Sequence, residues 1–440
     1  MSNQFTLMRE KRFWPFFCVQ FLGAFNDNVF KTALITLVVF HAASLTMLDP
    51  GMLATLLPGL FILPFLLFSA TAGQIADKFE KAKLMRLVKL FELGIMLLAA
   101  AGFVLHLLWL LVLVLFMMGM HSTLFGPIKY AYLPQHLSER ELVGGNGMVE
   151  MGTFSAILLG QILGAWLAMR HGGELLTGAV VVALAVIGYG FSRQVPTSPA
   201  ADADLRINWN PVGETYKNIA SVSKAPSIWL AIIAISWFWF YGATLLAQFP
   251  QLAKGVLHGD ESLFVLLLAV FSVGVGIGSL ICERLSKGLV EIGLVAIGAI
   301  GLTLFGVDLY VSSTNIHNML SDPVLTASTF VEGVSQIRLL ADIALIGFSG
   351  GIFIVPLYAL IQTRAPKTHQ SRVIAANNMM NALFMVLSAG FSMVVFGRGF
   401  TIPQLFLMTA LLNALMLLYI CWRAPEYWVR MLGFWRNERQ

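Results

Sequence analysis

Apolar residues run through this 440-residue chain in long blocks that short polar segments separate. A helix needs about 20 residues to cross a bilayer core of about 30 Å, since each residue adds about 1.5 Å. Blocks of this length recur along the whole sequence. They predict an all-α membrane protein with twelve transmembrane helices, at residues 14–40, 53–76, 84–105, 108–132, 142–167, 174–192, 227–251, 262–282, 289–311, 336–362, 373–396 and 402–422.

Composition and charge agree with a membrane protein. Hydrophobic residues make up 58% of the chain and charged residues 12%, about half the usual charged share of a soluble domain. The net charge of +5 could indicate a nucleic-acid partner, but most of the 28 Lys and Arg residues fall on one side of the predicted membrane. With a cytoplasmic N-terminus the exceptions are Arg170, Lys254 and Arg398 outside, and Lys31, Lys129 and Arg338 within spans. This excess is typical of cytoplasmic loops, so we expect both termini in the cytoplasm and no nucleic-acid partner.

Neither a cleaved leader nor a metal centre is expected. Residues 1–12 are polar and basic, and the first apolar block is longer than the apolar core of a signal peptide. The three cysteines, Cys18, Cys282 and Cys421, are scattered in or beside apolar blocks. Such spacing supports neither a disulfide framework nor a metal site, and we expect no cofactor.

The two halves of the chain repeat one another. Three pairs of motifs correspond: residues 73–83 with 278–287, residues 127–135 with 356–362, and Asn146 and Glu150 with Asn377 and Asn381. The second copy is longer, and the polar stretch 312–335 accounts for the excess. The repeat therefore contains six spans, with one insertion in a loop of the second copy.

This repeat predicts the domain organisation. Residues 1–192 form the first six-helix half, and residues 226–424 form the second half with a periplasmic insertion at 312–335. Residues 193–225, rich in Pro, Ser and charge, form a cytoplasmic linker, and residues 425–440 form a cytoplasmic amphipathic tail. Repeated six-helix halves are typical of secondary transporters, which bind substrate where the halves meet.

The motif GQIADKFEKAK, residues 73–83, resembles the signature between helices 2 and 3 of the major facilitator superfamily. In that superfamily the acidic residue, here Asp77, caps a neighbouring helix and holds the two halves in the outward-open state. The resemblance implies the major facilitator fold, and a conformational gating role for Gly73, Asp77, Lys78 and Lys81.

Five further motifs narrow the resemblance: QFLGAFNDN (20–28), GPIKY (126–130), NGMVE (146–150), GGIFIVPLYALIQ (350–362) and AANN (375–378). Together they are similar to the lysophospholipid transporter family. That similarity implies a flippase of the bacterial inner membrane, which moves lysophosphatidylethanolamine and lysophosphatidylglycerol from the outer to the inner leaflet by alternating access. The lipids are then reacylated.

The same resemblance implies partners. The tail at 425–436 looks like the segment that leads, in fused relatives, into an acyltransferase and an acyl–carrier-protein synthetase. Either enzyme would be a cytoplasmic partner, and membrane lipids and a coupling cation complete the expected set. Where members of the family tend to carry a basic residue in helix 7, Gln248 is the nearest polar group here.

Asp27 is the most informative polar residue, because it lies near mid-depth in the first span. A charge at the bilayer centre costs about 2.5–3.5 kcal/mol on insertion scales, so such residues usually have a function. The structural alternative is an ion pair with Lys31, one helical turn further on.

Other polar residues extend this interpretation. Lys129 can pair with a lipid phosphate or with Glu150, and Glu92 lies on the same side of the membrane; the alternative is a static network. The asparagines can line a path or hold helices together. The candidate substrate-binding residues are Asp27, Asn28, Lys31, Glu92, Lys129, Asn146, Glu150, Gln248, Gln362, Asn377, Asn378 and Asn381.

Two alternatives stay open. A transporter of the same fold could carry drugs or small anions instead of lipids. An intramembrane serine hydrolase is the alternative from another class, because GFSGG (347–351) places Ser349 in a G-x-S-x-G pattern. A serine nucleophile needs a base, and no later span contains a histidine. His317 and Asp322 have an acyltransferase-like spacing, which we interpret as coincidence because they lie in a short loop.

Overall fold

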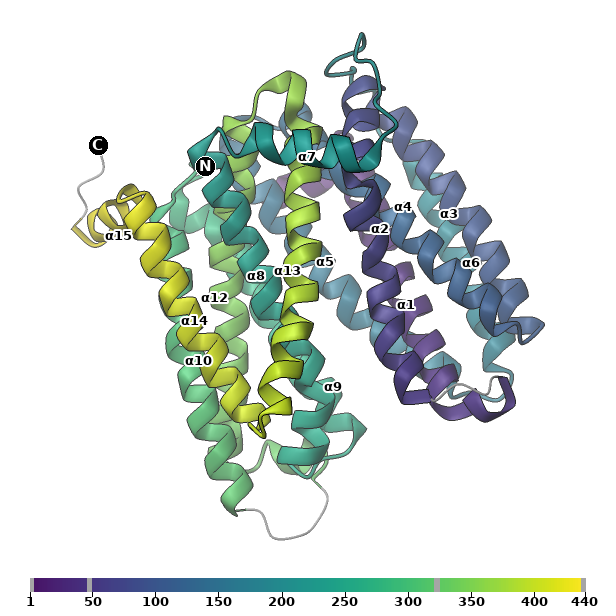
Figure 1. Ribbon diagram of the computed structural model, residues 1–440, viewed down its shortest axis with the longest axis vertical. Coiled ribbons are helices and arrows are strands. Elements are labelled where there is room, and N and C mark those ends of the chain that lie inside the picture. The colour runs from purple at the N-terminus through teal and green to yellow at the C-terminus, as the bar shows by residue number, and fades with distance from the viewer. Residues whose placement is uncertain (1–3, 46–49, 320–324, 437–440) are drawn as a thin grey trace. The chain divides into compact units, whose positions relative to one another are not determined.

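The structure, a computed structural model, describes residues 4–45, 50–319 and 325–436, and this part of the chain is helical apart from connections and one isolated bridge (Figure 1). Every predicted span corresponds to one α-helix. These helices are α1 (Trp14–Leu45), α2 (Pro50–Lys78), α3 (Lys81–Val104), α4 (Leu108–His136), α5 (Glu139–Ala168), α6 (Gly173–Ser192), α8 (Pro226–Gln251), α9 (Glu261–Ser286), α10 (Gly293–Met319), α12 (Val334–Arg364), α13 (Gln370–Gly397) and α14 (Ile402–Arg423).

Shorter elements connect the long helices: η1 (Gln4–Arg9), α7 (Pro211–Val222), the π-helical η2 (Leu252–Val256), α11 (Ala327–Phe330), η3 (Lys367–His369) and α15 (Glu426–Arg436). Side chains at several helix starts satisfy the exposed N–H groups there. Glu80 accepts from the N–H groups of Ala82 and Lys83 at the start of α3, at 2.8 and 2.7 Å. Asp260 does the same for α9, where bonds from Ser262 lower the pKa of its carboxyl.

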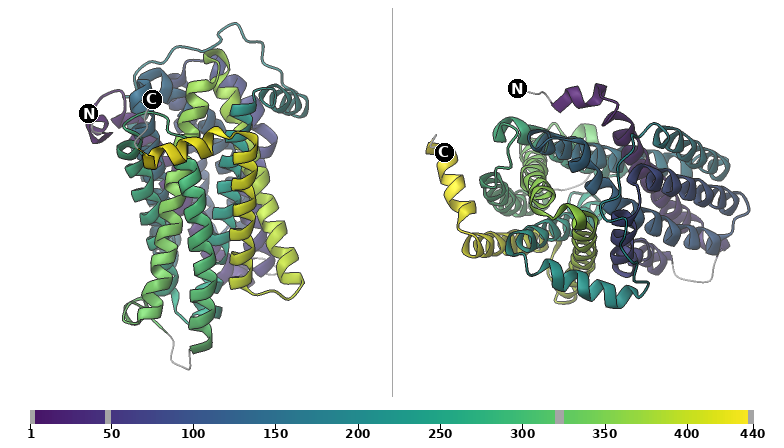
Figure 2. Two further views of the ribbon diagram at one scale, coloured as in Figure 1. Left: turned by 90° about the vertical axis from the view of Figure 1, so that its left-hand side faces the viewer. Right: turned by 90° about the horizontal axis from the view of Figure 1, so that it is seen from above.

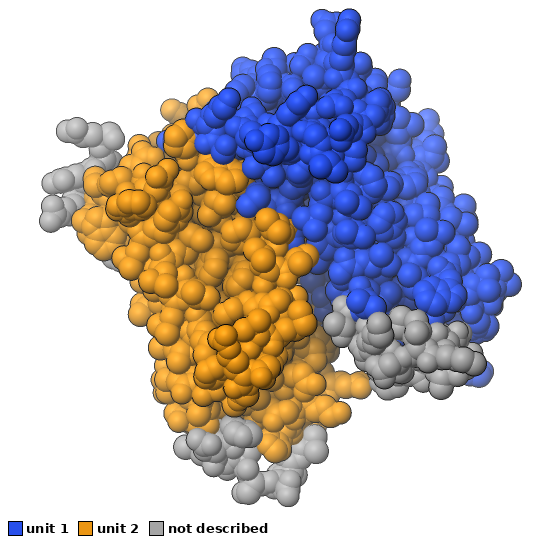
Figure 3. Space-filling view, in the orientation of Figure 1, with its two compact units in different colours: residues 1–138, 155–225, 362–382 blue, residues 139–154, 226–361, 383–440 orange. Residues whose placement is uncertain are grey.

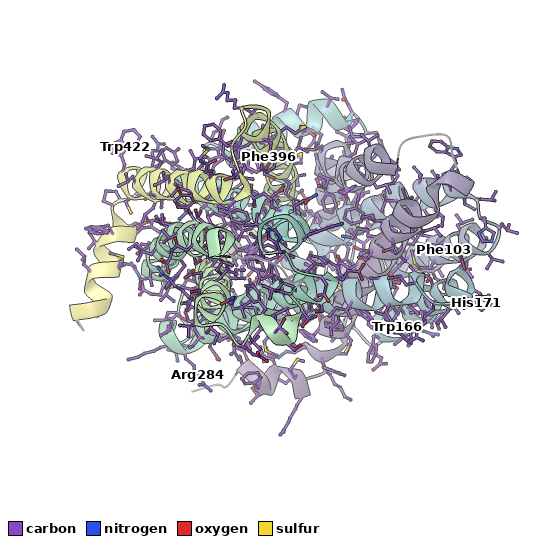
Figure 4. All side chains as sticks on the ribbon, turned by 90° about the horizontal axis from the view of Figure 1, so that it is seen from below. Phe103, Trp166, His171, Arg284, Phe396 and Trp422 are labelled. Carbon is purple, nitrogen blue, oxygen red and sulfur yellow. The ribbon has the colours of Figure 1, made fainter. Side chains whose placement is uncertain are left out.

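The long helices suit a bilayer. Eleven helices in the described part of the chain are long and apolar enough to cross a membrane. Helix α1 is not one of them, because four of its residues between 26 and 31 are polar and lower its mean hydropathy. Large apolar side chains stay exposed on the outer faces, among them Trp166 and Trp422, which are 49% and 74% exposed (Figure 4). So much exposed apolar surface is typical of a lipid-facing protein.

The chain divides into two compact units (Figure 3). Unit 1 contains residues 1–138, 155–225 and 362–382, and unit 2 contains residues 139–154, 226–361 and 383–440. The border runs through α5 and α13, so each of these helices contributes one half to each unit. The predicted halves, divided at the 193–225 linker, do not include this exchange of half-helices between the units. They stay a prediction.

Unit 1 is built around α1, α2, α3, α4 and α6, whose apolar side chains form one core. Helix α5 joins them through small residues. A Cβ atom at Gly160 would lie 2.8 Å from the carbonyl oxygen of Phe25 in α1, and one at Gly164 would meet the backbone of Val29. Only glycine allows such a close approach between helices.

Unit 2 is held by polar bonds between buried aromatic and amide groups. Trp237 of α8 donates to Asn413 of α14 at 2.9 Å, and Asn413 donates to Thr303 of α10 at 2.9 Å. Tyr241 of α8 donates to the carbonyl of Leu302 at 3.0 Å. Three helices are thereby fixed to one another by direct hydrogen bonds.

The predicted linker contains a helix that hydropathy does not indicate. Helix α7 starts at Pro211 behind Asn210, whose side chain accepts from the N–H of Gly213 at 3.0 Å. It runs across the end of α2 instead of along it (Figure 1). Asn218 fixes α7 by donating to the carbonyl of Arg372 at 2.9 Å.

Helix α10 continues to Met319, beyond the predicted end of its span at residue 311, while the insertion at 312–335 stays a prediction. Ser313 is buried there and donates to the carbonyl of Leu309 at 2.6 Å, so its polarity is satisfied inside the helix. Beyond residues 320–324, Leu325 forms a β-bridge with Gly259. The histidine and aspartate of the acyltransferase-like spacing lie outside the described side chains.

The tail forms α15, which turns away from the direction of α14 (Figure 2). Tyr427 and Met431 are buried, whereas Trp428, Val429 and Leu432 are exposed. The backbone of Met431 packs on Gly293 at the start of α10. The tail is therefore an amphipathic helix docked on unit 2.

Candidate functional site

A buried group of charges lies in unit 1, centred on the carboxylate of Glu92 in α3. Its Oε2 atom is 2.5 Å from Nζ of Lys89 and 3.3 Å from Nε2 of His121 in α4. Its Oε1 accepts from Nδ2 of Asn26 in α1 at 2.9 Å. All four side chains are buried, with Lys89 and Glu92 at 0% exposure. We call these four residues the Glu92 cluster.

Two glycines make room for Lys89. A Cβ atom at Gly23 of α1 would lie 2.8 Å from Nζ of Lys89, and one at Gly188 of α6 would lie 3.5 Å from it. The lysine therefore passes between two helices at points where neither has a side chain. A charge in such a place needs close partners, which Glu92 supplies.

Asp27 adjoins the Glu92 cluster. Its Oδ2 atom accepts from the hydroxyl of Ser122 at 2.6 Å, while its Oδ1 atom is buried without a hydrogen-bond partner among the described residues. Asn26 and Asp27 are neighbours on α1, as His121 and Ser122 are on α4. Consecutive residues of α1 therefore contact the Glu92 cluster and Ser122 of α4. This places Asp27 beside the buried charges.

Lys31 does not pair with Asp27. Its Nζ atom lies 4.3 Å from the centre of the Phe61 ring in α2, a cation–π contact. The structural alternative for Asp27, an ion pair one helical turn apart, is therefore not what the described residues form. One oxygen of a nearly buried carboxylate is left to accept a donor from elsewhere.

Three other candidates in unit 1 have contacts away from Asp27. Asn28 donates to the carbonyl of Ala24 at 2.7 Å, and Gln362 donates to the carbonyl of Tyr130 at 3.0 Å. The Lys129 amine lies 4.8 Å from the centre of the Tyr130 ring. None of these three contacts brings its residue to Asp27.

The asparagines of α13 differ from one another. Asn377 is fully buried, and neither atom of its amide has a hydrogen-bond partner among the described residues. The amide of Asn378 lies against Gly126 of α4, where a Cβ atom would collide with it. Asn381 is nearly buried one turn further on. Asn377 therefore remains the stronger candidate for a substrate contact.

Three candidates belong to unit 2. Asn146 and Glu150 are buried in the first half of α5, and Asn146 donates to the carbonyl of Leu142 at 2.8 Å. Gln248 is half-buried near the end of α8. The predicted exchange of Lys129 between a phosphate and Glu150 stays a prediction.

Asp77, in the last turn of α2, caps the start of α13. Its carboxylate accepts from the N–H of Ser371 at 2.9 Å and from the N–H of Arg372 at 3.3 Å. The Arg372 guanidinium adds an ion pair at 2.9 Å. A carboxylate at a helix N-terminus satisfies orphan donors and the helix dipole together. A Cβ atom at Gly73 would lie 3.0 Å from Cα of Arg372, so this glycine permits the contact.

The rest of the gating motif holds the linker. The carbonyl of Asp77 accepts from the N–H groups of Ala201 and Asp202, both at 2.9 Å, and Lys78 donates to the carbonyl of Leu205 at 2.8 Å. Lys81 is buried, and its amine has no hydrogen-bond partner among the described residues. The motif thus joins α2, α13 and the linker within unit 1.

Sequence reasoning missed several charged residues. Lys89 lies close to the predicted cytoplasmic end of its span, where it resembles an ordinary topological charge, but it is fully buried. His121 and Ser122 carry no charge pattern that would mark them. In unit 2, Asp308 pairs with Arg338, and Asp342 accepts from Ser312 at 2.8 Å. For these residues of unit 2, the available sequence signal was an acid in each of two neighbouring spans.

The described residues contain no group of three or more His, Cys, Asp or Glu that could hold a metal. Unit 2 also has an apolar groove of about 390 Å³ between α9 and α12. Gly274 and Phe348 are among its lining residues.

Comparisons with known proteins agree with this architecture. A sequence profile described as the Major Facilitator Superfamily matches residues 16–389. A protein of Serratia proteamaculans named Lysophospholipid transporter LplT is 28% identical over 384 residues, 85% of each chain. A protein of Yersinia enterocolitica with the same name is 28% identical over 387 residues, 86% of each chain.

Solved structures show the same fold. The Escherichia coli fucose:proton symporter FucP superposes with a TM-score of 0.68 at 13% identity, over 94% of this chain and 100% of that one. The human organic anion transporter TETRAN gives a TM-score of 0.70 at 13% identity, over 92% and 99%. Identities this low show the fold alone, and they confirm the predicted fold class.

The buried pair predicts a specific pattern of stability. Lys89→Met or Glu92→Gln alone leaves one buried charge unpaired and should destabilise the protein by about 3–5 kcal/mol. The double variant should lose less than the sum of the two, because both charges are gone. Unfolding in detergent measures all three variants.

The control is the half-exposed pair Asp308 and Arg338, whose side chains are 36% and 52% exposed. Its loss should leave the stability nearly unchanged, because water and salt screen an exposed pair. Additive, equally small effects at Lys89 and Glu92 would contradict a buried ion pair.

Proposed function

The chain belongs to the major facilitator superfamily, a family with a transporter fold, and from this premise we propose that it moves lysophospholipids across the membrane. Lysophosphatidylethanolamine and lysophosphatidylglycerol pass from the outer to the inner leaflet of a bacterial inner membrane by alternating access. Relatives named as lysophospholipid transporters, aligned over most of both chains, support the substrate class.

One observation supports this proposal from the site itself: Asp27 has an unpartnered carboxylate oxygen inside a membrane-spanning helix. An unsatisfied buried acceptor costs about 1–3 kcal/mol, so a ligand that supplies a donor there gains binding energy. The ammonium of lysophosphatidylethanolamine is such a donor. Lys129 then takes the phosphate, as a point charge on a flexible stem.

The alternatives have less support. The drug or small-anion antiporter rests on the fold, which the solved structures share. The hydroxyl of Ser349 lies against Gly301 of α10, and the described residues give it no histidine, lysine or carboxylate partner. A hydrolase on Ser349 would lack the base that activates it. The acyltransferase or synthetase partner stays a prediction.

Transport assays in proteoliposomes test the proposal. Asp27→Asn and Lys129→Ala should each abolish flipping of lysophosphatidylethanolamine, because the headgroup loses a counter-charge. Lys129→Arg should retain part of the rate, since phosphate accepts either cation. Asp204→Asn, an exposed acid of the linker, is the matched control and should be neutral. Near-normal rates for correctly inserted Asp27→Asn would reject the site.

A second prediction concerns gating by Asp77, which we propose stabilises the outward-open state. Asp77→Asn keeps the size of the side chain but loses the charge that Arg372 pairs with. Transport should slow while lysolipid binding stays nearly intact. Asp202→Asn, which contacts Arg372 at 3.2 Å but caps no helix, should have a smaller effect. An unchanged rate for Asp77→Asn would leave it as a structural cap only.

Orientation is tested by labelling, since we propose that both termini and the linker are cytoplasmic. Val334 is 85% exposed and Lys217 of α7 is exposed, whereas Ser313 is buried and unsuitable as a probe. Single cysteines at positions 334 and 217, each in a Cys421→Ser background, should differ in how they are labelled in intact spheroplasts. An impermeant maleimide should label position 334 alone, and labelling of 217 alone would invert the topology.

A further inference from the structure

His121 is a buried titratable group for which the transport site described so far has no use. It is 1% exposed, and the ring stacks on Phe125 one turn along α4. Nε2 faces Glu92 at 3.3 Å, and Nδ1 has no hydrogen-bond partner among the described residues. Histidine is the side chain that ordinarily changes charge between pH 5 and 8.

The charges around His121 come from two of the helices packed against α4. Helix α3 contributes Lys89 and Glu92, and α1 contributes Asp27, bonded to the residue next to His121. Helix α2 has no titratable side chain between residues 56 and 76. Lys31, held on Phe61, is the remaining nearby cation.

With a neutral imidazole, Lys89 neutralises Glu92, and the carboxylate of Asp27 has no ion-pair partner among the described residues, since Lys31 lies on Phe61. A proton on His121 adds one positive charge, which Asp27 can offset only while its own carboxylate is unoccupied. An ammonium bound to Asp27 adds the same charge to the same group of residues. Both together would put an uncompensated charge in a buried site, which is unfavourable.

We propose that His121 is a proton-binding residue that competes with the cationic headgroup at Asp27, so that binding of lysophosphatidylethanolamine expels a proton. This inference rests on the proposed function. It assigns to His121 a role in headgroup discrimination: lysophosphatidylglycerol carries the same phosphate but no ammonium, and its binding leaves the proton in place.

The sign follows from linkage. A ligand that lowers proton affinity is itself bound more tightly when the proton is absent, by the same factor. Affinity for lysophosphatidylethanolamine should therefore rise with pH, as the competing proton becomes scarcer. The expected rise is about tenfold, within the range of about 5–150-fold typical of coupling between two sites. Affinity for lysophosphatidylglycerol should stay level or fall.

The experiment measures the Kd of both lysolipids for the purified full chain from pH 5.5 to 8.0, over which neither headgroup changes its charge. Wild type should show the rise for lysophosphatidylethanolamine only. His121→Gln should abolish the rise, whereas His171→Gln, at an exposed turn after α5, should keep it (Figure 4). Equal pH dependence for both lipids, or a rise that survives His121→Gln, would overturn the proposal.

A second measurement needs no variant. Adding lysophosphatidylethanolamine to wild-type protein in weak buffer should release a proton that an indicator dye detects, and lysophosphatidylglycerol should release none. Tight binding of lysophosphatidylethanolamine without proton release overturns the role of His121 and leaves lysolipid transport intact. Failure of both lipids to bind at any pH would instead reject the proposed function, and this inference with it.

Discussion

The carboxylate of Glu92 is the constraint around which unit 1 is arranged. It is fully buried, and a buried carboxylate is tolerable only with close donors. Its partners come from three helices: Asn26 of α1 and Lys89 of α3 itself donate to it, and Nε2 of His121 in α4 lies 3.3 Å away. Satisfying this one group fixes the positions of α1 and α4 along α3. It therefore determines which residues of α1 and α4 lie opposite each other.

The next residues are those that could meet a ligand. Asn26 is bonded to Glu92, and His121 also faces Glu92. The next residue of each helix, Asp27 in α1 and Ser122 in α4, then forms the neighbouring contact between the two helices. Ser122 satisfies one oxygen of Asp27 and leaves the other unpartnered. The energy spent on this unsatisfied acceptor, about 1–3 kcal/mol, is recovered when a donor binds. A buried ionic cluster thus supports the side chain that we propose binds a cation.

Much of the fold could be predicted from the sequence because membrane spans have a simple hydropathy signal. All twelve helices lie where apolar blocks indicate, and errors occur where polar residues are satisfied inside a helix. Ser313 bonds to its own helix, so α10 continues past the predicted end. Helix α7 is polar on average and has only its cap, Asn210, and Pro211 as signals. The exchange of half-helices depends on packing and has no local signature.

Part of the buried charged group in unit 1 could be anticipated from the sequence. Asp27 and Glu92 stand out because acids are rare in apolar blocks. Lys89 does not, because a lysine near the end of a span resembles an ordinary topological charge. The contacts of Asp27 depend on Ser122, and a hydroxyl in a membrane helix is too common to indicate a partner. The contact of Lys31 with Phe61 was equally hidden, because an aromatic ring on another helix has no local signal in the sequence.

The central claim is that Asp27 binds the headgroup, and a structure of the protein with lysophosphatidylethanolamine bound tests it most directly. The account predicts the ammonium nitrogen about 2.7–3.2 Å from Oδ1 of Asp27, with the bond from Ser122 retained. A headgroup bound away from α1, with Asp27 in contact only with Ser122, would contradict the account.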